Sequence, residues 1–106
     1  IKNLTKLELL SVNDNLIEEL PESIGKLTAL EDFVLRDNLI TNIPESIGTM
    51  KSLKTIDIGE NPIHELPRSL IDLKNLRSLF LKGLLIEKSS SSVVKALRGK
   101  KVYIFK

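Results

Sequence analysis

The chain has 106 residues, of which 42% are hydrophobic and 28% are charged, and its formal net charge is +2 at pH 7. These values fit one globular domain with a modest core. The absence of cysteine excludes disulfides, thiolate metal ligands and a cysteine nucleophile. Because only 4% of the residues are aromatic and tryptophan is absent, the core must consist almost entirely of leucine, isoleucine and valine.

A unit of 23 residues repeats along almost the whole chain. Four copies follow one another at residues 4–26, 27–49, 50–72 and 73–95, and a partial copy continues to residue 106. A fixed period of this length is typical of solenoids, in which each unit stacks on the next. We therefore expect one repeat domain over residues 1–106. Because the first residues align with the tail of a repeat, we also expect the chain to be the C-terminal part of a longer array.

Each copy begins with a short predicted strand. Apolar residues two positions apart point to one side of an extended chain. Such pairs recur once per copy, at Leu10/Val12, Phe33/Leu35, Ile56/Ile58, Leu79/Leu81 and Val102/Ile104. The segments between them are too short for a full crossover helix, so stacking the copies would bury the pairs under a parallel sheet with a strand spacing of about 4.8 Å.

An asparagine follows each of the first three predicted strands, at Asn15, Asn38 and Asn61. The chain turns inward there and leaves backbone groups without partners in the sheet. A buried asparagine offers two donors and an acceptor to such groups, each of which costs about 1–3 kcal/mol if it stays unpaired. We expect these side chains to stack as a buried ladder.

The second half of each copy turns back on the other side of the predicted sheet. Pro21, Pro44 and Pro67 block continuation of a strand. A serine and an apolar residue that would fill the core follow each proline. These features predict a short turn or 3₁₀ segment in each repeat, on the convex side.

The pattern breaks toward the C-terminus. Leu84 stands at the asparagine position, Ile71 and Val94 replace the glycine, and four serines at residues 89–92 overwrite the Leu-Pro pair. These departures indicate that the array ends here.

The last residues predict a cap. Residues 91–99 favour a short helix with a serine N-cap and Gly99 as terminator, and a last strand is expected at residues 101–105. End repeats of a solenoid have to cover an exposed core edge. We therefore interpret residues 89–106 as the C-terminal cap.

The repeated core resembles the leucine-rich repeat family, whose pattern L-x-x-L-x-L-x-x-N-x-L is matched in three copies. The matching residues are Leu7, Leu10, Val12, Asn15 and Ile17, then Leu30, Phe33, Leu35, Asn38 and Ile40, then Leu53, Ile56, Ile58, Asn61 and Ile63. The resemblance implies an α/β solenoid of short parallel strands in a curved array, with extended or 3₁₀ convex segments and a helix–strand cap. The LPxSIGxL phrasing is similar to the class found in intracellular signalling scaffolds and in bacterial and plant proteins.

No catalytic or cofactor motif stands out in the sequence. It contains no glycine-rich phosphate loop, no His/Glu metal pattern and no G-x-S-x-G. His64, the only histidine, falls beside Glu65 in the turn after the third predicted strand. We interpret it as an exposed loop side chain, because catalysis needs a convergent pocket and a nucleophile. We expect no enzyme activity, no cofactor, no metal and no small-molecule substrate.

Binding in a solenoid is expected on the outward strand positions, which form one continuous concave surface. At the 23-residue period, Phe80 and Tyr103 fall in one column on adjacent strands, with Phe105 beside Tyr103. Aromatic side chains in a desolvated patch dominate binding energy. The alternative is that the cap or a further segment folds over them. The candidate partner-binding residues are Val34, Arg36, Asp37, Asp57, Glu60, Phe80, Lys82, Lys101, Tyr103 and Phe105.

Charge is polarised along the chain. Residues 1–66 contain 6 Lys or Arg against 12 Asp or Glu, a net charge of −6. Residues 67–106 contain 10 against 2, a net charge of +8, and the two portions add to the +2 of the whole chain. This asymmetry indicates an oriented partner or a head-to-tail contact with another copy.

We therefore expect a non-catalytic module that binds a protein partner on its concave strand surface. One alternative is the recognition domain of a multidomain enzyme or signalling scaffold. A second, less favoured alternative is binding to nucleic acid or an anionic surface through the basic C-terminal end, where lysines flank the aromatics.

The cellular location of the protein is predicted from two features that its sequence lacks. No apolar run approaches the roughly 18 residues that span a membrane, and the first residues lack the features of a signal peptide. We expect a cytoplasmic protein, with a secreted bacterial protein as the alternative. Leu4, Leu7 and Leu10 would leave the N-terminal edge uncapped, which would allow weak self-association.

Overall fold

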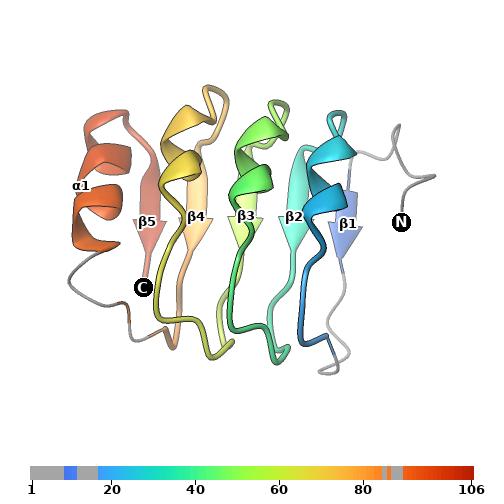
Figure 1. Ribbon diagram of the computed structural model, residues 1–106. Helices are drawn as coiled ribbons and strands as arrows, with labels where there is room; N and C mark the ends of the chain where they lie inside the picture. Colours follow the sequence, from blue (N-terminus) through green and yellow to red (C-terminus); the bar gives the residue numbers. More distant parts are fainter. Residues whose placement is uncertain (1–8, 12–16, 85, 87–89) are drawn as a thin grey trace.

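Five short strands lie side by side in one parallel sheet in the computed structural model, which describes residues 9–11, 17–84, 86 and 90–106 (Figure 1). Their order in the sheet is the order in the chain. The strands are β1 (Leu9–Ser11), β2 (Asp32–Val34), β3 (Thr55–Asp57), β4 (Ser78–Phe80) and β5 (Tyr103–Phe105).

A second layer lies in front of the sheet in Figure 1. It consists of three 3₁₀ segments and one helix, which are η1 (Glu22–Lys26), η2 (Glu45–Thr49), η3 (Arg68–Asp72) and α1 (Ser91–Gly99). Each strand therefore leads into a short return segment before the next strand begins. This arrangement is the predicted α/β solenoid, and the 3₁₀ segments lie where the prolines predicted them.

The core fills the space between the two layers. Neighbouring strands pair 23 positions apart from β1 to β4, so that Phe33 faces Ile56 and Ile56 faces Leu79. The predicted apolar pairs of β2, β3 and β4 are all buried, namely Phe33, Leu35, Ile56, Ile58, Leu79 and Leu81. The first predicted pair lies outside the residues whose side chains the structure describes.

Asn61 shows how the buried asparagines join neighbouring repeats. Its side chain is 5% exposed, and its Nδ2 donates hydrogen bonds to the carbonyl oxygens of Leu35, Ile58 and Gly59, each at 3.0 Å. Its Oδ1 accepts a hydrogen bond from the Ile40 N–H at 3.1 Å. Leu35 and Ile40 belong to the preceding repeat, so one side chain satisfies backbone groups of two repeats.

Asn38 has the same role in the preceding repeat. Its Nδ2 donates to the carbonyl oxygens of Leu35 at 3.0 Å and Arg36 at 3.3 Å, and its Oδ1 accepts from the Ile17 N–H at 3.1 Å. The predicted ladder is thus confirmed at two positions, and its third member, Asn15, lies outside the described residues.

Close packing of the 3₁₀ segments requires glycine. A Cβ added at Gly25 would lie 2.7 Å from the carbonyl oxygen of Ser46, and one at Gly48 would lie 2.9 Å from that of Ser69. Real side chains do not tolerate such contacts without a shift of the backbone. Ile71 occupies the equivalent position in η3, which has η2 on one side and the helix α1, in place of a further 3₁₀ segment, on the other.

The helix α1 forms at the predicted residues, with a serine at its N-cap as predicted. Ser90 is the N-cap, but its side chain makes no cap hydrogen bond. Its Oγ instead accepts a hydrogen bond from the N–H of Leu66 at 2.9 Å. The serine therefore ties the helix to the preceding repeat.

The predicted register of the last strand is wrong. Ser78 pairs with Tyr103, 25 positions later, and Phe80 pairs with Phe105, whereas Thr55 pairs with Ser78 after 23 positions. An α-helix advances about 1.5 Å per residue and a 3₁₀ segment about 2.0 Å, so a helical return needs more residues for the same span. Lys101, predicted as the first residue of this strand, lies before it with φ of +68°.

The corrected register brings two aromatic rings together. Phe80 and Phe105 stack with their ring centroids 4.5 Å apart and their planes inclined by 11°. The pair that sequence spacing predicted, Phe80 and Tyr103, lies on a diagonal instead of directly across the two strands.

Asn61→Leu should lower the free energy of unfolding by about 2–4 kcal/mol, because several buried backbone groups lose their partner and each costs about 1–3 kcal/mol. The matched control is Asn42→Leu, since Asn42 is exposed. Urea denaturation of both variants measures the difference. Equal midpoints for the two variants would contradict the bridging role of Asn61.

Gly48→Ala should lower the free energy of unfolding by about 1–3 kcal/mol, because the added methyl group overpacks the contact with Ser69. Gly99→Ala is its control, since a Cβ there meets nothing within 4 Å, and alanine in a helix is favoured over glycine by up to about 1 kcal/mol. Thermal unfolding compares them. A destabilisation of similar size in both variants would refute the close approach of η2 and η3.

A double-mutant cycle in which Phe80 and Phe105 are changed to leucine should give a coupling of about 0.5–1.5 kcal/mol, as stacked aromatic pairs do. The cycle of Phe80 with Tyr103 should give a value near zero. Chemical denaturation of the single and double variants provides both numbers. The opposite ranking would restore the 23-residue register for β5.

Candidate functional site

The outward side chains of the sheet form the surface that we call the strand face. It has two columns that run across the strands, formed by Asp32, Thr55, Ser78 and Tyr103 and by Val34, Asp57, Phe80 and Phe105. Two residues after the ends of β2, β3 and β4 come Arg36, Gly59 and Lys82. The 3₁₀ segments and α1 cover the opposite side of the sheet (Figure 1), so this face has no protein layer of the described residues over it.

Three aromatic residues gather at the β4–β5 end of the strand face. We call this group, Phe80, Tyr103 and Phe105, the aromatic corner. Tyr103 is 69% exposed and Phe105 47%, while Phe80 is partly buried beneath its stack with Phe105. The fourth aromatic residue, Phe33, is fully buried in the core. The described residues of the cap do not fold over the corner, so its rings are available to a partner.

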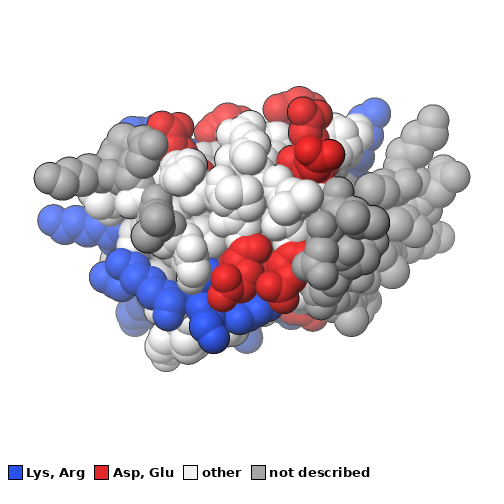
Figure 2. Space-filling model, turned by 90° about the horizontal axis from the view of Figure 1, so that it is seen from below, with Lys and Arg blue, Asp and Glu red and all other residues white. Residues whose placement is uncertain are grey.

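Basic residues flank the aromatic corner. Lys82 and Lys106 are exposed, and Lys82 lies two residues after the end of β4 while Lys106 directly follows β5. Figure 2, which looks at the end where the strands terminate, shows basic side chains gathered toward the β5 side and acidic side chains nearer the middle. Lys101 is exposed but lies in the turn between α1 and β5, where its N–H donates to the carbonyl oxygen of Arg98 at 3.0 Å. Lys101 is therefore not part of the last strand, where the sequence placed it.

Arg36 forms ion pairs with two of the acidic side chains that the sequence predicted on this surface. Its Nη1 lies 3.7 Å from Oδ2 of Asp57, and its Nε lies 4.0 Å from Oδ2 of Asp37. Oδ1 of Asp57 also accepts a hydrogen bond from the Gly59 N–H at 3.0 Å, and only 16% of the Asp57 side chain is exposed. Asp57 is therefore held by neighbours within the protein.

Asp37 and Glu60 remain open to solvent in the turns that follow β2 and β3. Both backbones are left-handed, with φ of 61° and 54°. Their N–H groups continue the inter-strand pattern by donating to the carbonyl oxygens of Gly59 and Lys82. These two carboxylates are the acidic groups of the predicted set that a partner could contact most freely.

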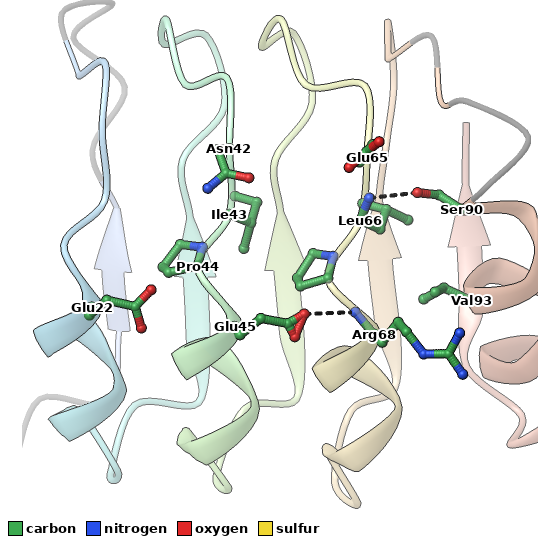
Figure 3. Close-up of a pocket in the computed structure, with 11 residues that line it drawn as sticks. Glu22, Asn42, Ile43, Pro44, Glu45, Glu65, Leu66, Arg68, Ser90 and Val93 are labelled. Atoms are coloured by element: carbon green, nitrogen blue, oxygen red, sulfur yellow. Dashed lines mark hydrogen bonds between the residues drawn. The ribbon is translucent and has the colours of Figure 1, made fainter.

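A hollow of about 430 Å³ lies on the other side of the molecule, between η2, η3 and the start of α1 (Figure 3). Its polar groups are used to join repeats. Glu45 Oε1 accepts a hydrogen bond from the Arg68 N–H at 3.1 Å, and the Ser90 Oγ accepts one from Leu66. These contacts were not predicted from the sequence. A polar residue follows the proline that precedes each 3₁₀ segment, and this recurrence could have indicated the contact of Glu45 with Arg68.

The residues that the structure describes form no cluster of the kind that holds a metal ion. No group of three or more His, Cys, Asp or Glu side chains there could hold a metal ion. His64 is exposed, as its place in the turn predicted. The searched residues also contain no helix with the length and apolar character needed to cross a membrane.

Solved structures of repeat proteins are similar to this fold. An internalin of Listeria monocytogenes matches with a TM-score of 0.84 and 25% identity over 98% of this chain and 29% of its own. A leucine-rich repeat protein of Leptospira interrogans matches with a TM-score of 0.68 and 26% identity over 99% of this chain and 32% of its own. This chain therefore spans about a third of the length of these neighbours. None of the curated protein sequences compared with it matches significantly.

Two family models match the chain itself. Both describe the leucine-rich repeat, one over residues 6–27 and the other over residues 28–85. Proteins built of these repeats are typically non-catalytic modules for protein interaction. The matched residues include the strands β1 to β4 and both asparagines of the described ladder. The chain belongs to the leucine-rich repeat family.

Proposed function

We propose that residues 1–106 form one non-catalytic domain that binds a protein partner on its strand face, with the aromatic corner as the anchor. The domain would consist of repeats at residues 4–26, 27–49, 50–72 and 73–95, with the cap at residues 89–106. The observation that carries this proposal is the exposure of Tyr103 and Phe105 on a face that no described layer covers.

The aromatic corner has the properties of a binding anchor. An aromatic side chain buries about 150–250 Å² when it is fully covered, and tyrosine is enriched among the residues that dominate interface energies. The stack with Phe80 holds the Phe105 ring in one orientation. A ring that is already fixed loses less conformational entropy when a partner binds.

The charges around the aromatic corner would fix the orientation in which a partner binds. Lys82 and Lys106 are exposed at the ends of β4 and β5, the strands that carry the aromatic rings, while Asp37 and Glu60 lie toward the middle of the array. A partner with acidic groups near its aromatic-binding patch and basic groups farther along would match this order. Such complementarity acts mainly by speeding encounter and fixing orientation.

Binding to nucleic acid is the second candidate, because lysines beside exposed aromatic rings can hold a single strand. Two features favour a protein partner over it. Lys101, which the sequence placed in the last strand among these lysines, lies in the turn before β5, and Asp37 and Glu60 would repel phosphates on the same surface. A salt titration separates the two, since phosphate contacts make affinity fall steeply with salt concentration.

The wider setting of the domain is also a proposal. Attachment to an enzymatic or signalling domain is an alternative in which this domain supplies recognition. We propose that the protein is located in the cytoplasm, and the alternative is a secreted bacterial protein. The bacterial sources of the similar structures are compatible with both.

A photo-crosslinking amino acid in place of Tyr103 should capture the protein partner, and the same group in place of Leu39 should not. Leu39 is the matched control because it is an exposed apolar residue, 50% accessible, outside the two columns of the strand face. After the captured protein is identified and purified, calorimetry should show that Tyr103→Ala and Phe105→Ala each weaken binding by about 2 kcal/mol, roughly thirtyfold.

Leu39→Ala should leave the affinity unchanged. Circular dichroism would confirm that the variants are folded at the temperature of the measurement. Wild-type affinity in both aromatic variants, or crosslinking from Leu39 in place of Tyr103, would move the binding site away from the aromatic corner.

A further inference from the structure

The outer edge of β5 carries backbone groups that no other strand of the described chain uses. On its inner side, the Tyr103 N–H donates to the carbonyl oxygen of Arg77 at 2.8 Å, and the Phe105 carbonyl oxygen accepts from the Leu81 N–H at 2.6 Å. In a parallel ladder, successive residues of a strand direct their hydrogen-bonding groups to opposite sides. The N–H and C=O of Ile104 therefore point outward, away from β4.

Among the described residues no strand pairs with this edge, and just before β5 the Val102 N–H donates to the carbonyl oxygen of Leu97 in α1 at 3.0 Å. A hollow of about 400 Å³ borders it, lined by Arg98, Lys101, Val102, Tyr103 and Ile104. Arg98 comes from the end of α1, and the other four residues lead into and form β5. The hollow thus lies beside the outward backbone groups, with apolar surface from Val102 and Ile104 and a basic side chain at each end of the turn.

The charge around the edge favours an acidic ligand. Residues 73–106 contain nine Lys or Arg and a single acidic residue, Glu87. Arg98 and Lys101 are exposed, and neither belongs to an ion pair among the described residues. Charged side chains also protect an edge strand from pairing with a copy of itself. The same charges would repel another basic edge and attract an acidic chain.

We propose that β5 accepts an extended acidic segment of a protein partner as a sixth strand of the sheet. The N–H and C=O of Ile104 would pair with the backbone of this segment, and Arg98 and Lys101 would contact its carboxylates. Backbone pairing of this kind provides affinity, and the side chains beside the edge provide selectivity. The proposal does not depend on the strand face, because the edge uses backbone groups that the aromatic corner leaves free.

The test uses the 106-residue chain labelled with ¹⁵N and a capped octapeptide in which glutamate and valine alternate. We expect the peptide to shift the amide signals of Ile104 and Lys106 and to slow exchange of the Ile104 N–H. A peptide of alternating lysine and valine should cause no such change. The glutamate peptide with an N-methyl group on every residue should not bind either, because it has no N–H donors for the edge.

Paired variants of the protein test the role of charge. Arg98→Gln with Lys101→Gln should weaken binding of the glutamate peptide roughly five- to tenfold. Lys26→Gln with Lys51→Gln removes two exposed charges far from β5 and should change the affinity less than about twofold. Both double variants change surface side chains alone, so each should remain folded.

Four results would overturn the proposal. They are a glutamate peptide that fails to shift Ile104 at millimolar concentration, equal binding of the N-methylated peptide, and equal effects of the two double variants. The fourth is protection of the Ile104 N–H that rises with protein concentration when no peptide is present, since a second copy would then occupy the edge. The first of these four results includes shifts confined to Val34 and Asp57, which would place the peptide on the strand face.

Discussion

Hydrogen bonding by buried asparagines between neighbouring repeats is the constraint on which the rest of this structure depends. Strands of three residues offer few backbone hydrogen bonds, and the chain must turn inward directly after each one. Asn61 satisfies carbonyl groups of its own turn together with the Leu35 carbonyl and the Ile40 N–H of the preceding repeat. The side chain thereby fixes the distance and the register between repeats, and the apolar residues fill a core whose dimensions are already set.

That constraint also explains why the two sides of the sheet differ. The inward side chains must be apolar and close in size, and the glycines at positions 25 and 48 let the return segments pack closely behind them. The outward side chains meet no such demand, so they can vary without loss of the fold. The aromatic corner and the open edge of β5 both lie at the end of the array where the asparagine gives way to Leu84. The regular repeats thus supply stability, and the irregular end carries both of the proposed binding surfaces.

Most of the fold could be predicted because repetition multiplies weak signals. One alternating pair such as Ile56 and Ile58 is ambiguous, but the same pair at a constant interval defines strands, register and core together. The register of β5 could not be predicted in this way, since the helical return of residues 91–99 uses more residues than a 3₁₀ segment. The contact of Arg36 with Asp57 and the left-handed turn at Asp37 depend on side-chain and backbone geometry that no period encodes. The period therefore identified most residues of the outward surface, but it misplaced some of their neighbours near β5.

Hydrogen–deuterium exchange of the domain with and without its protein partner can locate the binding surface, because it maps every backbone segment in one experiment. We expect the partner to slow exchange in residues 78–82 and 103–106, which carry the aromatic corner, and to leave exchange in the 3₁₀ segments at residues 45–49 and 68–72 unchanged. Protection confined to those 3₁₀ segments would place the partner on the convex side and would contradict the assignment of the strand face as the binding surface.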